Sequence, residues 1–535
     1  MSFENIGVMF DCSRNAVAKP ETIKKLIGIM SDLGYTFAMM YTEDTYPLKN
    51  QPYFGYLRGG YTRAEIKEID DYAKSRGIEL IPCVQTLSHL SNLSKRKPYS
   101  EFMENESTLL IDDEKTYEFI ESIFQNLSET FTSKKVHIGM DEAFGIGLGL
   151  HLRKYGYENR YALFARHLKR VAEIAEKYGF KPMIWSDMIF SLLGAGSYYS
   201  NVTDIDNTET DLVPKNIDLV YWDYYGTDVE KHAKVLKLHK KFGCNVYYAG
   251  GALNWTGFVP GNILSMQANE AGVKACKKSG VKNAFITIWG DDGKESSFFS
   301  VLPTIYAFSR YVKGEFEKDK TEQGFFEYFN IRLDDFLLLD SLNKPGKEEA
   351  IFNNPHKYFL FNDLLSGSFD CFVRKGMGEK YAEKAKALKK AAAYTGEYHY
   401  IFDCIATLAE VLSIKTELGV DLRLAYRAKN KSKIFSITEQ LSVLSEKAEK
   451  FYTEFKALWM KENKPYGFEI HAIKLGGLIR RIADVKERLE EYLAGISLRI
   501  PELEDEILPF WGNQTDCEEQ TMLTQWCRMV TENYL

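Results

Sequence analysis

The chain has 535 residues, of which 45% are hydrophobic and 27% are charged, and this balance is that of a folded globular protein, not of a disordered or fibrous one. Its formal net charge of -7 offers no basic surface to attract phosphates, which argues against nucleic acid and against an anionic membrane as partners. The length favours two domains.

Short β-branched or aromatic runs alternate with amphipathic stretches from residue 6 to about residue 313, a pattern typical of βα units in a parallel sheet. Eight of these runs are expected to be strands, at residues 6–14, 36–44, 78–86, 135–142, 181–188, 217–225, 244–251 and 283–293. Eight parallel strands are the number that closes a barrel. The sequence therefore predicts an α/β fold with a catalytic (β/α)8 TIM barrel over residues 1–313.

The connection after the fifth predicted strand, SLLGAGSYYSNVTDIDNTETD, lacks the helical pattern of the others. It is rich in Gly, Ser, Asn and Asp, which favour turns over helix interiors. We expect a reduced or irregular fifth helix there.

After about residue 314 the strand pattern ends, and long charged, Leu- and Ala-rich stretches follow, such as EKYAEKAKALKKAAAYTGEYHYIFDCIATLAEVLSIKTELG. Their spacing indicates amphipathic helices. Residues 314–535 are therefore predicted to form a mostly α-helical C-terminal domain. The apolar faces of these helices allow either a homodimer or packing against the barrel.

The eight cysteines show no CxxC and no Cys/His cluster at the spacing of metal ligands, so we expect neither a metal nor another cofactor. The N-terminus lacks a basic stretch followed by a long apolar one, and no apolar run approaches eighteen residues. These features predict a cytoplasmic protein that does not enter a membrane.

In a barrel of this class, functional residues lie where the strands end at the C-terminal face. The polar and aromatic residues expected at those ends are Asp11, Arg14, Glu43, Asp44, Gln85, His89, His137, Asp141, Glu142, Trp185, Asp187, Trp222, Asp223, Tyr224, Tyr248, Trp255, Trp289, Asp291 and Asp292. Carboxylates and aromatic rings around one cavity suit a neutral sugar, because its C–H faces can lie on the rings while its hydroxyls bond to the polar groups. A carbohydrate is thus the expected partner.

Asp141 and Glu142 are adjacent carboxylates that end the fourth predicted strand in VHIGMDE. Glycosidic bond cleavage usually needs two carboxyl groups. Side chains of adjacent strand residues point to opposite faces, so these two can share a pocket only where the strand has ended and the backbone turns. A lone Asp-Glu pair is common on solvated surfaces, but its place in the barrel pattern favours a catalytic role.

HIGMDE resembles the H-x-G-x-D-E signature of glycoside hydrolase family 20, the β-N-acetylhexosaminidases. DCSRN resembles the opening D-x-x-R of that family, YTRAEIKEIDDYAKSRGIELIP resembles the segment leading to its third strand, and WGDDG resembles its closing Trp-x-acid element. The resemblance spans residues 6–313. It is closest to bacterial members that start directly with the barrel and carry a helical C-terminal domain.

The resemblance implies an exo-acting glycosidase that removes terminal β-linked GlcNAc, and also GalNAc, from oligosaccharides or glycoconjugates. In that family the nucleophile is the 2-acetamido oxygen of the substrate, which gives an oxazolinium intermediate and retention of configuration. The resemblance makes Glu142 the general acid and then the general base. It makes Asp141 the group that orients the acetamido N–H and stabilises the developing positive charge.

The same resemblance assigns substrate-binding residues. Arg14 would hold the 3- and 4-hydroxyls of the terminal sugar, and Asp291 would meet its 4- or 6-hydroxyl. Either Tyr224 or Tyr248 would bond the acetamido oxygen, and the sequence does not choose between them. The acetamido pocket would be walled by Trp185, Trp222 and Trp289.

Three further residues complete the expected binding set. Trp255 is a fourth aromatic residue near a strand end. His89 lies in PCVQTLSH, where the family has acidic residues and a Pro-Gly-His, so its supporting role carries over less directly. His137 is expected either to take part directly or to be a buried histidine that bonds a backbone group.

Two other functions stay open at this point. A glycosidase acting on a sugar without the acetamido group would lose little activity on Asp141→Asn. A non-catalytic carbohydrate-binding protein, in which the helical domain does the work, would function equally well after Glu142→Gln.

Overall fold

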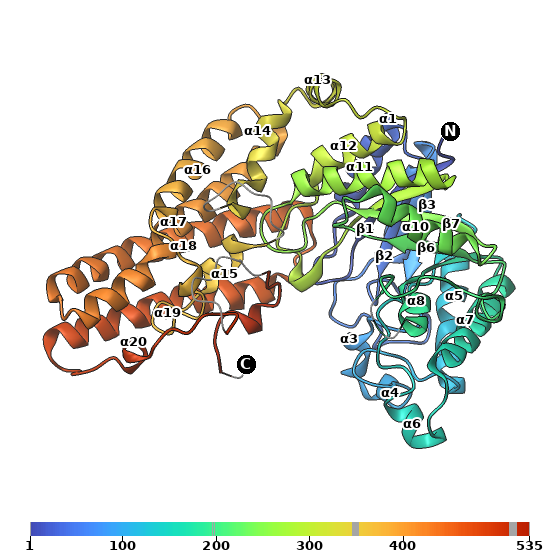
Figure 1. Ribbon diagram of the computed structural model, residues 1–535, viewed down its shortest axis with the longest axis horizontal. Coiled ribbons are helices and arrows are strands. Elements are labelled where there is room, and N and C mark those ends of the chain that lie inside the picture. The colour runs from blue at the N-terminus through green and yellow to red at the C-terminus, as the bar shows by residue number, and fades with distance from the viewer. Residues whose placement is uncertain (1, 195, 197, 345–352, 513–521, 534–535) are drawn as a thin grey trace. The chain divides into compact units, whose positions relative to one another are not determined.

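The computed structural model describes residues 2–194, 196, 198–344, 353–512 and 522–533, and it divides into two compact units (Figure 1). The first unit comprises Met1–Ala252, Ser265–Trp289 and Thr304–Glu317, and the second comprises Leu253–Leu264, Gly290–Pro303 and Lys318–Leu535. The longest segment of the second unit thus begins at Lys318, close to the boundary at residue 314 that the sequence predicted. It also takes two segments, 253–264 and 290–303, that the sequence placed with the barrel.

Hydrogen bonds within the second unit explain why it includes those segments. Asn262 donates from Nδ2 to Asp340 Oδ1 over 3.0 Å, and the backbone N–H of Phe298 donates to Glu462 Oε2 over 2.9 Å. Asp340 and Glu462 belong to the helical region, so the two segments are tied to it by buried polar groups.

Eight parallel strands close a barrel in chain order, and β8 pairs with β1. The strands are β1 (Asn5–Asp11), β2 (Phe37–Thr42), β3 (Glu79–Val84), β4 (Lys135–His137), β5 (Lys181–Trp185), β6 (Asp218–Trp222), β7 (Asn245–Gly251) and β8 (Asn283–Ile288). Nearly all strand residues are buried, as expected of a parallel sheet covered on both faces. The predicted TIM barrel is confirmed.

Helices follow the strands and cover the barrel, and their ends carry local signals. In α2, Thr62 and Glu65 form a reciprocal capping box, which satisfies backbone donors at the helix start. The helices of this region are α1 (Pro20–Leu33), α2 (Arg63–Ser75), α3 (Ser91–Ser94), α4 (Lys97–Ser100), α5 (Glu114–Thr130), α6 (Leu150–Tyr155), α7 (Arg160–Lys177), α10 (Val229–Lys240), α11 (Asn262–Ser279) and α12 (Leu302–Tyr311).

The fifth connection contains only two short helices, α8 (Asp187–Leu193) and α9 (Asn207–Thr210). The predicted reduction of the fifth helix is therefore confirmed. The described residues between α8 and α9 form no regular structure.

The second unit is built from helices, which confirms the predicted mostly α-helical C-terminal region. The three longest, α17 (His399–Arg427), α18 (Lys431–Glu462) and α19 (Phe468–Ala494), lie side by side (Figure 1). The others are α13 (Lys318–Phe329), α14 (Leu333–Leu337), α15 (Pro355–Phe361), α16 (Met377–Ala392) and α20 (Pro501–Glu504), with short 3-10 helices between them.

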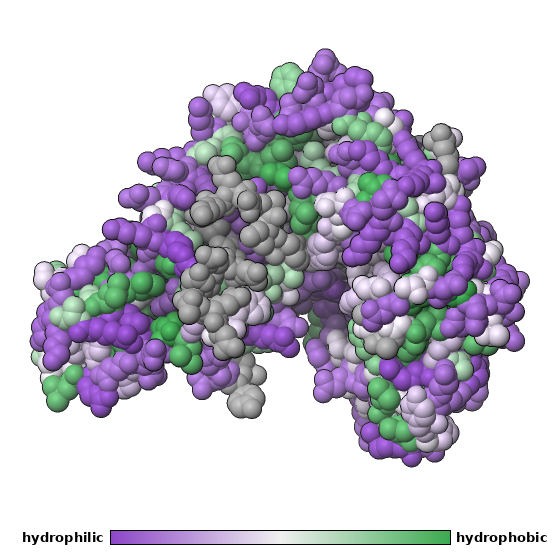
Figure 2. Space-filling view, in the orientation of Figure 1, coloured by the Kyte–Doolittle hydropathy of each residue, from purple (hydrophilic) through white to green (hydrophobic). Residues whose placement is uncertain are grey.

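Hydrophilic side chains cover most of the face seen in Figure 2, with hydrophobic residues scattered among them. Within the described parts of the chain, none of the helices combines the length and the hydropathy that crossing a bilayer requires.

Candidate active site

The backbone turns sharply just after β4, and this turn carries the two adjacent carboxylates. Gly139, Met140 and Glu142 have φ values of +69°, +71° and +52°. Non-glycine residues adopt such values at a cost, and they gather at functional sites. The turn ends the alternation of the strand, and both carboxylates reach one imidazole: His89 Nε2 lies 3.1 Å from Asp141 Oδ2 and 3.6 Å from Glu142 Oε2.

Asp141 is a buried carboxylate with two polar neighbours. Gln85 donates from Nε2 to its Oδ1 over 2.8 Å, and His89 faces its Oδ2. Burial by itself raises the pKa of Asp141, but the charge of His89 and the hydrogen bonds from His89 and Gln85 outweigh it and bring that pKa to about 2. Asp141 is therefore ionised at neutral pH.

Arg14 follows β1 and connects several side chains of the barrel mouth. Its Nε lies 3.2 Å from Glu43 Oε1, and its Nη2 lies 3.3 Å from His89 Nδ1. The guanidinium also lies over the rings of Tyr41 and Trp289, at 5.7 and 5.2 Å from their centroids. Arg14, Glu43 and His89 thus form one chain of contacts that leads to Asp141.

The protonation of His89 depends on two opposing neighbours. Burial lowers the pKa of His89 and the Asp141 carboxylate raises it, and together they bring this pKa to about 9. The Arg14 contact points the other way, because a guanidinium only donates and so requires Nδ1 to accept. With its pKa at about 9, His89 carries the positive charge that holds Asp141 ionised, and the Arg14 contact opposes that charge without removing it.

Glu142 is held by two groups and remains partly open to solvent, with its side chain 38% exposed. The Tyr198 hydroxyl donates to Oε1 over 2.7 Å, and the Glu142 backbone N–H donates to Asp187 Oδ2 over 3.0 Å. Burial, followed by the negative charge of Asp141, raises the pKa of Asp187 to about 8. Asp187 is therefore a neutral carboxylic acid near pH 7.

His137 and Trp185 lie deeper in the barrel, with ring centroids 4.4 Å apart. The Gly139 N–H donates to His137 Nδ1 over 3.1 Å, and burial lowers the His137 pKa to about 3, so this ring is neutral. Among the described residues, His137 Nε2 and Trp185 Nε1 have no hydrogen-bond partner. Buried polar atoms of this kind require an explanation, and a bound ligand supplies one.

Trp289 and Tyr224 adjoin the same region. The ring centroids of Trp289 and Trp185 lie 5.9 Å apart, and Tyr224 stacks on Trp222 with ring centroids 5.0 Å apart. Burial raises the pKa of Tyr224, whereas hydrogen bonds with Trp289 and Thr287 lower it. Tyr224 is thus placed with the other site residues.

Tyr248 is not placed with them. Its hydroxyl donates to the Asp223 carbonyl oxygen over 3.3 Å. A Cβ atom added to Gly272 of α11 would lie 2.1 Å from that hydroxyl, so Tyr248 points into the helix layer. Of the two tyrosines left open by the sequence, Tyr224 is the one near Asp141. Trp255 and Asp291 belong to the second unit, and their roles remain predictions.

Four residues of the cluster were not in the expected binding set. Glu43, Gln85 and Asp187 stand at predicted strand ends, so their positions were available, but nothing in the sequence indicated which contacts they make. Tyr198 lies in the irregular fifth connection, where no periodicity places a side chain. The only signal for Tyr198 is that this connection is not a helix.

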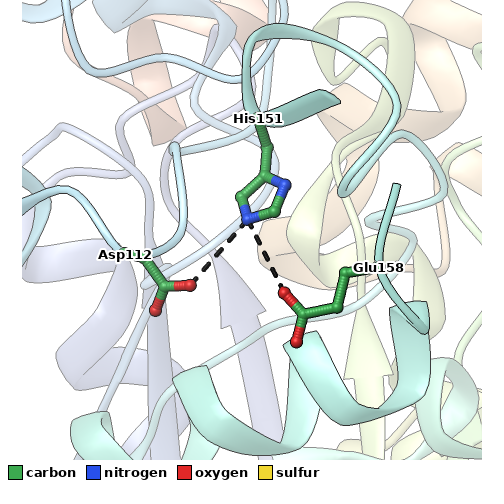
Figure 3. Close-up of side chains that lie close together, drawn as sticks. All are labelled: Asp112, His151 and Glu158. Carbon is green, nitrogen blue, oxygen red and sulfur yellow. Dashed lines mark ion pairs between the residues drawn. The ribbon is translucent and has the colours of Figure 1, made fainter. Parts of the chain in front are cut away.

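A separate group of side chains has the composition of a metal site. Asp112, His151 and Glu158 lie close together, with His151 Nε2 at 3.8 Å from Asp112 Oδ2 and 4.0 Å from Glu158 Oε2 (Figure 3). Arg166 already donates to both carboxylates: its Nε lies 3.1 Å from Asp112 Oδ1 and its Nη1 lies 2.7 Å from Glu158 Oε1. The chain thus supplies its own cation there, and these contacts join the segment before α5 to the segment around α6.

Two family models match the chain. The description "Glycosyl hydrolase family 20, catalytic domain" matches residues 40–236, and "Glycoside Hydrolase 20C C-terminal domain" matches residues 334–523. Both units of the structure thus contain a matched region.

Among curated proteins, the chain is similar to Hexosaminidase D of Homo sapiens, with 25% identity over 43% of this chain and 47% of that protein. It is 24% identical to Hexosaminidase D of Bos taurus over 43% of this chain and 66% of that protein. The chain thus spans between about half and two thirds of these relatives. A crystal structure of a β-N-acetylhexosaminidase from Bacteroides fragilis aligns at 18% identity over 61% of this chain and 70% of that chain, with a TM-score of 0.46.

Proposed function

Because this chain belongs to glycoside hydrolase family 20, we propose that it is an exo-acting β-N-acetylhexosaminidase that hydrolyses terminal β-linked GlcNAc and GalNAc. One observation carries the proposal. Asp141 and Glu142 converge on His89 at the C-terminal end of β4, and their surroundings differ as the two roles require. One carboxylate is buried and ionised, and the other is partly open to solvent.

In the proposed reaction, the 2-acetamido oxygen of the substrate attacks C1 while the bond from C1 to the glycosidic oxygen breaks. Glu142 gives its proton to that oxygen, and the leaving group departs as an alcohol. The resulting oxazolinium is positively charged, and the ionised Asp141 beside it accepts the acetamido N–H and stabilises that charge. Glu142, now a carboxylate, takes a proton from the water that attacks C1, and the bond from C1 to the acetamido oxygen breaks. This step regenerates the neutral acetamido group and the acid, and the second displacement at C1 retains the configuration.

The aromatic residues supply a pocket for the acetamido group. Trp185 and Trp289 offer apolar faces to its methyl, and the Tyr224 hydroxyl is the donor for its oxygen. His137 Nε2 and Trp185 Nε1 have no hydrogen-bond partner among the described residues, and a bound substrate can supply one. These features support an acetamido-bearing sugar over one with a plain 2-hydroxyl.

The test is the release of nitrophenol from an aryl β-N-acetylglucosaminide by the wild type and by Glu142→Gln. The amide cannot donate or accept the catalytic proton, so kcat/KM should fall about 10²- to 10⁴-fold. Glu106→Gln, an exposed glutamate of the first unit, is the matched control and should behave as wild type. Equal activity of Glu142→Gln and the wild type would rule out the assigned role.

A further inference from the structure

A row of aromatic side chains begins beside Glu142, and its two exposed members, Phe144 and Tyr198, have been given no contact with the substrate so far. Phe144 lies edge-on to Tyr198 with ring centroids 5.8 Å apart, and Tyr198 lies edge-on to Trp222 at 5.1 Å. Phe144 and Tyr198 are 42% and 37% exposed, although each already contacts another ring. Exposed rings beside a candidate active site offer a flat apolar surface to a ligand.

Tyr198 is held in this position by its neighbour. The ring of Tyr199 lies edge-on to Tyr221 at 4.8 Å and packs on Phe190 at 5.2 Å, and its hydroxyl lies 3.2 Å from Ser186 Oγ. Tyr198 itself has a φ of +41°, a strained conformation for a tyrosine. Such strain persists only where the surroundings impose it, and here it accompanies the hydrogen bond to Glu142.

We propose that Phe144 and Tyr198 form the subsite for the leaving group, and that Tyr198 also positions Glu142 for proton transfer. The inference rests on the proposed function. Glu142 protonates the glycosidic oxygen, so the group beyond that oxygen must lie next to the exposed part of Glu142. His89 lies near Oε2 of this residue and Asp187 accepts its backbone N–H, whereas Tyr198 reaches Oε1 and Phe144 packs edge-on against Tyr198.

The chemistry of the row indicates the class of leaving group. Its surface consists of rings, and the neighbouring Arg160 donates to the carbonyl oxygens of Phe144 and Ile146. A surface made of aromatic rings suits the C–H face of a further sugar ring. The substrate class is therefore an oligosaccharide in which the terminal N-acetylhexosamine is linked to another neutral sugar.

The Tyr198 hydroxyl has a defined effect on Glu142. It donates to Oε1, so Oε2 is the oxygen left to carry the catalytic proton. The same bond persists when Glu142 becomes a carboxylate, which keeps the side chain in place for the second step. Burial and then the charge of Glu142 raise the pKa of Tyr198, so the phenol remains a donor at neutral and moderately alkaline pH.

Three β-N-acetylglucosaminides separate the two parts of the proposal. The 2,4-dinitrophenyl glycoside has a leaving group that needs no proton. The methyl glycoside needs a proton but brings no ring, and a disaccharide with a second neutral sugar needs a proton and brings a ring. The variants are Tyr198→Phe, which removes only the hydroxyl, and Phe144→Ala, which removes only a ring. Tyr157→Phe, at a tyrosine that is 75% exposed, is the control.

Tyr198→Phe should lower kcat/KM, which reports the first step, about tenfold or more on the methyl glycoside and the disaccharide, and leave kcat/KM on the dinitrophenyl glycoside within about twofold. Phe144→Ala should raise KM for the disaccharide about 3- to 10-fold relative to the methyl glycoside. Tyr157→Phe should match the wild type on all three.

Suppose that the wild type releases N-acetylglucosamine. The leaving-group subsite is then overturned if each variant affects all three substrates equally, or if the variants have no effect. A wild type that releases it from none of the three would instead refute the proposed function, and this inference with it. The two failures are thus distinguished by the wild-type rates alone.

Discussion

Asp141 and Glu142 are neighbours in the sequence, but their surroundings differ. Asp141 is buried and accepts a hydrogen bond from Gln85, which favours its charged form. Glu142 is 38% exposed and bonded to Tyr198, so solvent and a leaving group can approach it. Assignment of two roles to two carboxylates follows from such differences in environment.

Asp141→Asn should therefore impair the reaction while preserving the shape of the site. The amide removes the negative charge that stabilises the oxazolinium, and a loss of about 10²- to 10³-fold in kcat on an aryl β-N-acetylglucosaminide is expected. Steady-state kinetics on the purified variant measure this loss. Asp113→Asn, at the start of α5, is the control and should keep the kcat of the wild type. If Asp141→Asn also has the kcat of the wild type, no charge develops beside Asp141 during the reaction.

Asp187 makes stability depend on pH. Its folded pKa of about 8 lies above the unfolded value of about 3.9, so its contribution to stability is fully present below about pH 4 and is lost as the pH rises toward 8. Asp187→Asn cannot ionise and should remove this decline, which amounts to at most about 1.4 kcal/mol per pH unit. Urea unfolding between pH 5 and pH 8 compares it with Asp71→Asn, an exposed aspartate of α2. Parallel pH curves for the wild type and Asp187→Asn would refute the raised pKa.

The strands and helices follow from patterns that act locally, which is why the barrel and the helical region were predictable. The errors lie at the C-terminal strand ends. The fourth strand was expected at 135–142 but stops at His137, because the backbone leaves the extended conformation at Gly139. The side-chain contacts of Glu43, Gln85 and Tyr198 depend on how loops meet in space, and no periodicity in the sequence encodes them.

The turn after β4 makes a specific demand on Gly139. Its φ is +69°, and an added Cβ atom would lie 2.1 Å from Gln85 Oε1 and 2.9 Å from the Val84 carbonyl oxygen. Gly139→Ala should displace Gln85 and thereby Asp141, with a loss of activity of about 100-fold or more. Gly156 has a φ of +84° and nothing within 4 Å of an added Cβ among the described residues.

Gly156→Ala is thus a matched control for Gly139→Ala. It should cost about 1–3 kcal/mol of stability from its backbone conformation, and leave kcat within about twofold. Thermal unfolding and kcat measured together separate the two effects. Equal activity losses in both variants would mean that the clash with Gln85 is not what disables the site.

At the scale of the whole molecule, the segment after β8 belongs to the helical unit because buried ion pairs tie it there. Lys357 of α15 lies 2.8 Å from Asp292 and 2.6 Å from Glu295, and its side chain is fully buried. Lys474 of α19 adds a second cation, whose Nζ lies 3.7 Å from Asp292 and 3.5 Å from Glu295. Such a network does not follow from the sequence, because it joins residues that are more than 60 positions apart.

Lys357→Met should leave the buried Glu295 and the partly buried Asp292 with Lys474 alone, and should destabilise the protein by about 3–5 kcal/mol. Lys318→Met removes an exposed ion pair with Glu322 and should cost less than about 1 kcal/mol. Denaturant unfolding of both variants measures the difference. A Lys357→Met protein as stable as Lys318→Met would mean that the buried pairs do not hold the segment.

The most direct test of the central claim compares nitrophenol release from the aryl β-N-acetylglucosaminide and from the plain aryl β-glucoside at the same enzyme concentration. If the acetamido oxygen is the nucleophile, the first substrate should react rapidly and the second almost not at all. Comparable rates on both substrates would contradict substrate assistance and leave a conventional glycosidase that uses two carboxylates.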